Sequence, residues 1–211
     1  MNLKIAVETL LKNAKKRNFI QTINLTINLR GVDVKNPKNR IDEEIFLPQG
    51  KGKNARVALF ATGELAFKAR GVADLVLTSE DIARLKENRR EAKKIASSYD
   101  FFVAETPLMS QIGKNLGMVL GPRGKMPKPI PQNAGPESFI EPLRKSVKVR
   151  TKNSPMMSLP VGREDMDVNS VCENVTTVMK RAESKLEKGK DNIRSVFLSL
   201  SMGESVKVEE W

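Results

Sequence analysis

The sequence contains no histidine and only one cysteine, Cys172. Without histidine, the commonest general base, the usual hydrolase triads and the commonest metal ligand are all missing. A single cysteine can form neither an intrachain disulfide nor a CxxC zinc site. These absences predict a protein without a metal ion or cofactor, and they favour a binding protein over an enzyme.

Long apolar segments and aromatic residues are also scarce. No apolar run approaches the roughly 20 residues of a membrane span, and the N-terminal segment MNLKIAVETLLKNAKKR lacks the apolar core and cleavage site of a secretory signal. We therefore expect a cytoplasmic protein without a membrane segment. Aromatic residues make up only 5% of the chain, whereas proteins that stack successive bases of a single strand need more. Recognition of a folded nucleic acid by its shape, phosphates and 2′-hydroxyls fits better.

Positive charge is abundant. The chain has 37 Lys and Arg residues against 25 Asp and Glu residues, so its net charge is +12. This excess suits a polyanionic partner. Nucleic acid is the favoured partner, and an anionic membrane or an acidic protein remains open on charge alone. The length of 211 residues suits one large domain or two small ones.

The two ends of the chain combine helices with half-buried strands. In TINLTINL the apolar and polar residues alternate strictly, which is typical of a strand with one buried face. The predicted elements are an amphipathic helix at 3–16, strands at 22–29 and near 43–47, a helix at 168–186 and a strand at 193–201. Met202 and Gly203 are expected to end the last strand.

The middle of the chain has a different pattern. Short apolar runs at 57–62, 72–77 and 101–105 alternate with helical stretches, the clearest at 79–96. Such alternation predicts a parallel sheet covered by helices.

We therefore predict two domains. Residues 1–52 and 153–211 would form a split βαβ-type α+β domain, and residues 53–152 would form an inserted, Rossmann-like three-layer α/β domain. The two connections, near Gly50–Gly52 and near Lys152–Ser154, would form a hinge.

The most unusual stretch is LGPRGKMPKPIP at 120–131. It contains four prolines, two glycines and the cations Arg123, Lys125 and Lys128, and no acidic residue occurs between Glu105 and Glu137. Prolines stiffen such a loop and glycines permit close approach. A solvated linker is the simpler interpretation of this pattern. The stretch is not a phosphate-binding Walker loop, because the required Gly-x4-Gly-Lys-Ser/Thr spacing is absent.

GPRGKMPKP also resembles the signature of the large-subunit ribosomal protein L1 family, the proteins of the ribosome's mobile stalk, most closely in its archaeal branch. Further resembling stretches occur in the family's order: RNFIQTINLTINL (17–29), PKNRIDEEIFLPQGKGK (37–53), DFFVAE (100–105), LPVG (159–162) and SVFLSLSMGESVKV (195–208). The resemblance extends over nearly the whole chain. It implies a two-domain protein with the middle domain inserted, which agrees with the prediction above.

The resemblance also implies partners. These are large-subunit ribosomal RNA at the stalk near the tRNA exit site, exit-site tRNA whose release the protein assists, and the protein's own mRNA, whose translation it represses. The implied protein is part of the large ribosomal subunit, is cytoplasmic and ribosome-associated, and is a monomer when free.

The RNA contacts that the resemblance implies are Phe19 and Thr22 before and in the first strand, Ser195 in the last strand, and the turn Ser201-Met202-Gly203. The family has threonine where Ser201 stands, so the hydroxyl is kept and a methyl group is lost. Without the resemblance, Phe19 is as readily a core residue, Met202 a gap filler and the serines a solvated strand face.

Several cations are further candidates. Lys16 and Arg17, beside Lys15, and Arg40 are expected to contact phosphates from the terminal domain. Arg123, Lys125 and Lys128 are expected to make secondary contacts with RNA or tRNA. The helix at 84–94 mixes cations with Glu87 and Glu91, and it is interpreted as a solvated face.

Two other functions compete with RNA binding. The alternating middle region resembles a nucleotide-binding enzyme domain, but its first strand–helix turn, FATGELAF, has one glycine and not the GxGxxG pattern. A basic protein-interaction module is the third possibility.

Overall fold

The computed structural model describes residues 2–34, 36, 39–131, 135–151 and 154–210. The chain divides into two compact units. We call residues 1–54 with 145–211 the terminal unit and residues 55–144 the inserted unit. Of the predicted connection near Lys152–Ser154, residues 152 and 153 lie outside the described residues.

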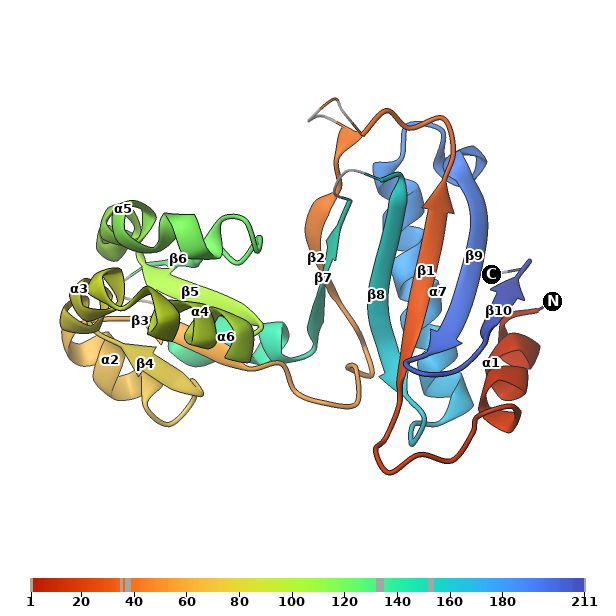
Figure 1. Cartoon of the computed structure of the whole chain (residues 1–211), viewed down its shortest axis with the longest axis horizontal. Helices are drawn as coiled ribbons and strands as arrows, with labels where there is room; N and C mark the ends of the chain where they lie inside the picture. Colours follow the sequence, from red (N-terminus) through yellow and green to blue (C-terminus); the bar gives the residue numbers. More distant parts are fainter. Residues whose placement is uncertain (1, 35, 37–38, 132–134, 152–153, 211) are drawn as a thin grey trace. The chain divides into compact units, whose positions relative to one another are not determined.

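A four-stranded antiparallel sheet in the order β10-β9-β1-β8 forms the centre of the terminal unit (Figure 1). Its strands are β1 (Thr22–Leu29), β8 (Met156–Arg163), β9 (Ile193–Leu200) and β10 (Ser205–Val208). Two helices, α1 (Leu3–Lys12) and α7 (Val168–Lys185), lie along one face of the sheet, with α7 running behind the strands in Figure 1. No helix of this unit covers the opposite face in the part of the chain that is described.

Hydrophobic burial explains why the sheet has one covered face. Ile23, Leu25 and Ile27 of β1 have no exposed surface, while the polar residues between them are half-buried. Val171, Val175 and Val178 of α7 are equally buried and belong to the same core. The predicted strand at 22–29 and the predicted long helix are therefore confirmed.

A two-stranded antiparallel sheet, β2 (Asp42–Phe46) and β7 (Ser146–Arg150), completes the terminal unit. Val147 and Val149 of β7 join the same core as Ile45 of β2. Since β7 pairs with β2, the chain has already returned to the terminal unit at Lys145. The sequence instead predicted this boundary after residue 152.

The inserted unit is a three-layer α/β structure. Its parallel sheet has the order β4-β3-β5-β6, with strands β3 (Val57–Phe60), β4 (Leu75–Leu77), β5 (Phe101–Glu105) and β6 (Lys128–Ile130). One core contains residues of α2 (Gly63–Ala69) and α6 (Pro136–Arg144). The other contains residues of α3 (Ser79–Glu87), α4 (Arg89–Ser98) and α5 (Met109–Leu120). The predicted fold class, α/β with α+β, is confirmed.

Some predicted elements differ from the structure. The single helix predicted at 79–96 is two helices, because Asn88 leaves the helical conformation and its side chain accepts a hydrogen bond from the Glu91 backbone at the start of α4. The strands β6, β7, β8 and β10 were not predicted. In β6 and β8 the reason is a proline, Pro129 or Pro160, a residue that is rare inside strands. Short 3-10 helices also occur in the described part of the chain, at η2 (Thr106–Leu108) and η3 (Gly189–Asn192).

A buried asparagine ties the outgoing chain to the terminal unit. The Asn174 side chain, which is 0% exposed, donates from Nδ2 to the carbonyls of Gly50 (2.7 Å) and Val161 (2.8 Å). Its Oδ1 accepts from the Gln49 backbone N–H at 3.2 Å. Arg163 in turn donates to the Gly52 carbonyl. The segment predicted as a hinge at Gly50–Gly52 is thus fixed to α7 and β8.

We expect Asn174→Leu to lower the free energy of unfolding of the terminal unit by about 2–4 kcal/mol, because each buried backbone group that loses its partner costs about 1–3 kcal/mol. Urea denaturation followed by circular dichroism measures this change. Asn169→Leu, at an exposed position on the same helix, is the matched control and should change stability by less than about 0.5 kcal/mol. Equal effects of the two substitutions would contradict the role of Asn174.

Candidate nucleic-acid interface

Polar side chains line the uncovered face of the terminal sheet. They are half-buried or exposed, and they alternate along the strands with the buried apolar residues. We call this face of the sheet the polar face. Its residues are Thr22, Asn24, Thr26, Asn28, Ser158, Ser195 and Ser199, together with the aromatic Phe197. The strand register brings them into lateral rows, which pair Asn24 with Ser199, Thr26 with Phe197, and Asn28 with Ser195.

Hydrogen bonds between strands fix the polar face. Thr26 Oγ1 donates to Ser158 Oγ at 3.3 Å, and Asn28 Nδ2 donates to Ser195 Oγ at 3.0 Å. A hydroxyl has one donor and two acceptor sites, and an amide has two of each, so these groups keep unused hydrogen-bonding capacity. Their orientation is set before any ligand binds, which lowers the entropic cost of recognition.

A second group of predicted residues meets at one end of this sheet. Because β1 and β9 are antiparallel, the beginning of β1 lies beside the turn that follows β9. We call these residues the end cluster, and they are Phe19, Thr22, Ser201, Met202 and Gly203. Phe19 is 48% and Met202 is 61% exposed, so the cluster presents two apolar side chains to solvent next to the polar face.

Ser201 joins the turn after β9 to the beginning of β1. Its Oγ accepts from the Thr22 backbone N–H at 3.2 Å and donates to the Thr22 carbonyl at 3.4 Å. The hydroxyl proton is therefore engaged within the protein, and an acceptor site remains for a ligand. Threonine at position 201 can form the same two bonds through its own hydroxyl.

Gln21 is a contributor that the sequence did not reveal. It is 1% exposed, and its Oε1 accepts from the Met202 backbone N–H at 3.2 Å. Its Nε2 donates to the Lys15 carbonyl and to Glu164. One buried amide thus positions the turn and the loop before β1, although a lone glutamine in a loop carries no recognisable signal.

Gly203 has a packing explanation. A Cβ atom at this position would lie 2.9 Å from Leu200 Cβ, closer than such atoms approach in proteins. The resemblance implies that Gly203 contacts RNA, but the proximity of Leu200 already accounts for a glycine at this position.

The predicted contacts do not form a single cluster. Ser195 pairs with Asn28, six residues along β1 from Thr22, which is roughly 20 Å at about 3.3 Å per residue. Arg40, whose Nε donates to the Val34 carbonyl, lies beyond the same far end of β1. Lys16 and Arg17 are exposed in the loop that leads to the end cluster. A surface that includes all of these predicted contacts is elongated, with the middle of the polar face between its two ends.

Comparison with known proteins identifies the family. The model of the ribosomal protein L1p/L10e family matches residues 10–204. The chain belongs to this family. Among its relatives are three proteins called large ribosomal subunit protein uL1. The one from Archaeoglobus fulgidus is 47% identical and covers 96% of this chain and 95% of its own length. The one from Thermoplasma acidophilum is 45% identical and covers 99% of this chain and 96% of its own length. The one from Methanosphaera stadtmanae is 46% identical and covers 96% of this chain and 96% of its own length.

We call residues 120–131, LGPRGKMPKPIP, the signature loop. In this family member, two of its cations contact the protein itself. Arg123 donates from Nη1 to the Lys93 carbonyl and to Ser97 Oγ, both at 2.8 Å. Lys125 donates from Nζ to the carbonyls of Ala96 (2.9 Å) and Tyr99 (2.6 Å). These groups lie at the C-terminal end of α4, where cations interact favourably with the helix dipole. Lys128 begins β6 and is exposed.

The switch point of the parallel sheet carries a carboxylate. In such sheets nucleotides bind at the carboxyl ends of the strands where the order reverses, here between β3 and β5. Glu105 ends β5, is 2% exposed, and accepts from Thr62 Oγ1 at 2.7 Å and the Thr62 backbone N–H at 3.3 Å. A negative charge at this point disfavours phosphate, which argues against the nucleotide-binding alternative.

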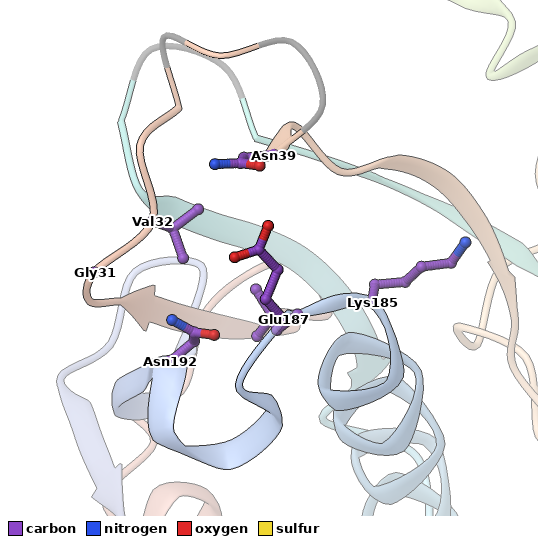
Figure 2. A pocket seen from close by; sticks show the side chains of 7 residues that line it. Gly31, Val32, Asn39, Lys185, Glu187 and Asn192 are labelled. Carbon is purple, nitrogen blue, oxygen red and sulfur yellow. The ribbon is translucent and has the colours of Figure 1, made fainter.

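One cavity of the terminal unit offers little room for a small ligand. A cavity of about 60 Å³ lies beside Gly31, Val32, Asn39, Glu187 and Asn192, with Lys185 extending away from the other labelled side chains (Figure 2), and it is large enough for a few water molecules. Asn192, which lines it, already bonds the backbone of Lys188 and Arg30.

Three further features bear on catalysis, metal binding and membranes. Burial raises the pKa of the Cys172 thiol, which disfavours the reactive thiolate. Within the described residues no three His, Cys, Asp or Glu side chains are grouped as a metal site requires. No described helix is both long and apolar enough to cross a membrane.

We expect Lys125→Met to destabilise the inserted unit by about 1–3 kcal/mol, since hydrogen bonds to charged groups contribute about that much. Thermal unfolding monitored by circular dichroism measures the loss. Lys114→Met, at an exposed site on α5, removes the same charge and serves as the control. If both variants unfold like the parent protein, Lys125 does not secure α4.

Proposed function

We propose that the polar face and the end cluster together bind folded ribosomal RNA, and that the protein is a structural component of the large ribosomal subunit. The observation that carries the proposal is the row of hydroxyl and amide groups fixed in place across three paired strands. Such groups donate to and accept from 2′-hydroxyls and phosphates. The relatives called large ribosomal subunit protein uL1 give the proposal its setting.

Each part of the interface has a role in this proposal. Thr22, Ser195 and Ser201 offer hydroxyls at the two ends, and Phe19 and Met202 cover a ribose or a base at the end cluster. Phe197, half-buried in the middle of the polar face beside Thr26, offers an apolar surface between polar neighbours. Lys16, Arg17 and Arg40 supply electrostatic attraction to phosphates without sequence preference.

The finer function follows from the resemblance of the signature and end-cluster residues to the family pattern. In our proposal the RNA is the mobile stalk near the tRNA exit site, where the protein assists release of deacylated tRNA. The same interface binds a segment of the protein's own mRNA that folds like the ribosomal site, and thereby represses translation. Footprinting of the protein on total ribosomal RNA tests the location directly, and protection elsewhere than the stalk would refute it.

We expect Ser195→Ala with Ser201→Val to weaken binding to stalk RNA by about 10- to 100-fold, because two hydroxyls each contribute about 1 kcal/mol or more. Filter binding measures the change. Thr177→Val with Ser184→Ala removes two hydroxyls from α7, on the covered side of the sheet, and should leave affinity unchanged. Lys125→Ala should weaken binding less than the double serine variant. The reverse ranking would move the specific site to the inserted unit.

Translation of the protein's own message provides a separate prediction. Added protein should repress an in vitro translation reaction programmed with that mRNA, because the message and the ribosomal RNA compete for one interface. The Ser195→Ala, Ser201→Val variant should repress less, in proportion to its weaker RNA binding. Equal repression by both proteins, or repression of an unrelated message, would rule out this mechanism.

A further inference from the structure

Helix α4 of the inserted unit carries an exposed row of cations. Its buried residues Ala92 and Ala96 pack into the core between α3, α4 and α5. The cations lie on the solvent side and are all exposed. We call them the α4 ridge, and they are Arg89, Arg90, Lys93 and Lys94. At 1.5 Å per residue, the ten-residue helix is about 15 Å long.

The charge of the α4 ridge is not neutralised by its neighbours. Glu91, the acidic residue within α4, accepts from Arg84 at 3.3 Å, and Asp81 lies 3.4 Å from the same guanidinium. None of the four ridge side chains forms an ion pair within the described chain. Arg123 adds a fifth cation, because its guanidinium binds the backbone of Lys93 and the side chain of Ser97.

This charge distribution does not favour the helix itself. Arg89 and Arg90 occupy the first turn of α4, where the helix dipole favours anions, and the last turn has no cation of its own. Arg89 with Lys93, and Arg90 with Lys94, are like-charge pairs four residues apart, which destabilise a helix. A local arrangement that works against folding is expected where a ligand compensates for it.

The signature loop explains how α4 keeps this arrangement. Arg123 and Lys125 donate to carbonyls and a hydroxyl at the C-terminal end of the helix. They supply there the cations that the helix lacks, and so they act as positioning residues for the ridge. The sequence instead predicted that these loop residues contact RNA or tRNA and that the helix is a solvated face.

We propose that the α4 ridge binds the sugar-phosphate backbone of a structured RNA, independently of its sequence. The ridge has no aromatic side chain to stack on a base and no apolar side chain to enter a membrane or a protein groove. Closely spaced cations that form no ion pair within the described chain match a chain of phosphates. This surface belongs to the inserted unit and involves none of the residues of the polar face or the end cluster.

The test uses the full chain with Arg90→Gln and Lys94→Gln, and an RNA duplex of unrelated sequence as the probe. Filter binding over a series of salt concentrations gives the affinity and its salt dependence. The control, Lys68→Gln with Arg70→Gln, removes two cations at and beside the end of α2, which packs into the opposite core of the inserted unit. We expect the ridge variant to bind about tenfold more weakly or worse at low salt, and the slope of log K against log salt to fall by about two.

Further outcomes separate this proposal from its alternatives. An equal loss in the control would mean that net charge alone attracts RNA, and an unchanged slope would mean that the ridge contacts no phosphate; either result overturns the proposal. The proposal is also overturned if the ridge variant keeps RNA binding but loses binding to phosphatidylserine vesicles or to polyglutamate, because the ridge would then bind a membrane or an acidic protein. Because the substitutions remove like-charge pairs, the unfolding temperature of the ridge variant should stay the same or rise slightly. If the unfolding temperature falls, filter binding over the salt series is repeated with Arg89→Gln and Lys93→Gln, and that result decides whether the ridge binds RNA.

The proposed function fails in a different way. The ridge variant should lose the same factor in affinity for stalk RNA and for the unrelated duplex. The Ser195→Ala, Ser201→Val variant should lose affinity for stalk RNA alone and keep its salt slope. Each surface can therefore be refuted without affecting the other.

Discussion

The terminal unit depends on the pairing of β1 between β8 and β9. Strand β1 comes from the first thirty residues and both of its neighbours come from the last sixty, so the central strand has no partner until the chain ends meet. Its apolar side, with Ile23, Leu25 and Ile27, is completely buried. Its other side supplies half of the polar face. One eight-residue segment thus provides both the core and the surface that we propose for RNA.

A different pairing, that of β2 with β7, encloses the inserted unit between two neighbouring strands of the terminal unit. After β2 the chain leaves the terminal unit, and on its return it enters β7 directly. Strand β7 pairs with β2 along its whole length. Asn174 fixes the outgoing segment at Gln49 and Gly50 through a buried amide. The inserted sheet and its two cores form from residues 55–144 alone. The insertion therefore adds a unit without interrupting the hydrogen bonding of the terminal sheet.

The sequence correctly predicted the strands and helices whose apolar residues recur at a regular spacing. The alternation in TINLTINL and the apolar spacing in α7 gave the right elements, because each pattern reports a single buried face. The same approach missed β8, where Pro160 and Gly162 interrupt the alternation. Gln21 and Asn174 were also missed, because a buried amide is recognisable only from partners that are distant in sequence, such as Met202 and Gly50.

The signature loop shows why a cation's role cannot be read from its sequence neighbours. Lys125 has no acidic neighbour in sequence, yet it binds the carbonyls of Ala96 and Tyr99. Helix α4, in contrast, has glutamates among its cations in sequence, yet the cations of the α4 ridge form no ion pair within the described chain. In the inserted unit, the strand edge where a nucleotide would bind bears Glu105, and the cations lie on the outer helix instead. A phosphate backbone that passes over the surface can reach α4, but a phosphate at the carboxyl ends of the strands would meet a buried negative charge. The distribution of charge in this α/β unit therefore favours an extended polyanion over a small nucleotide.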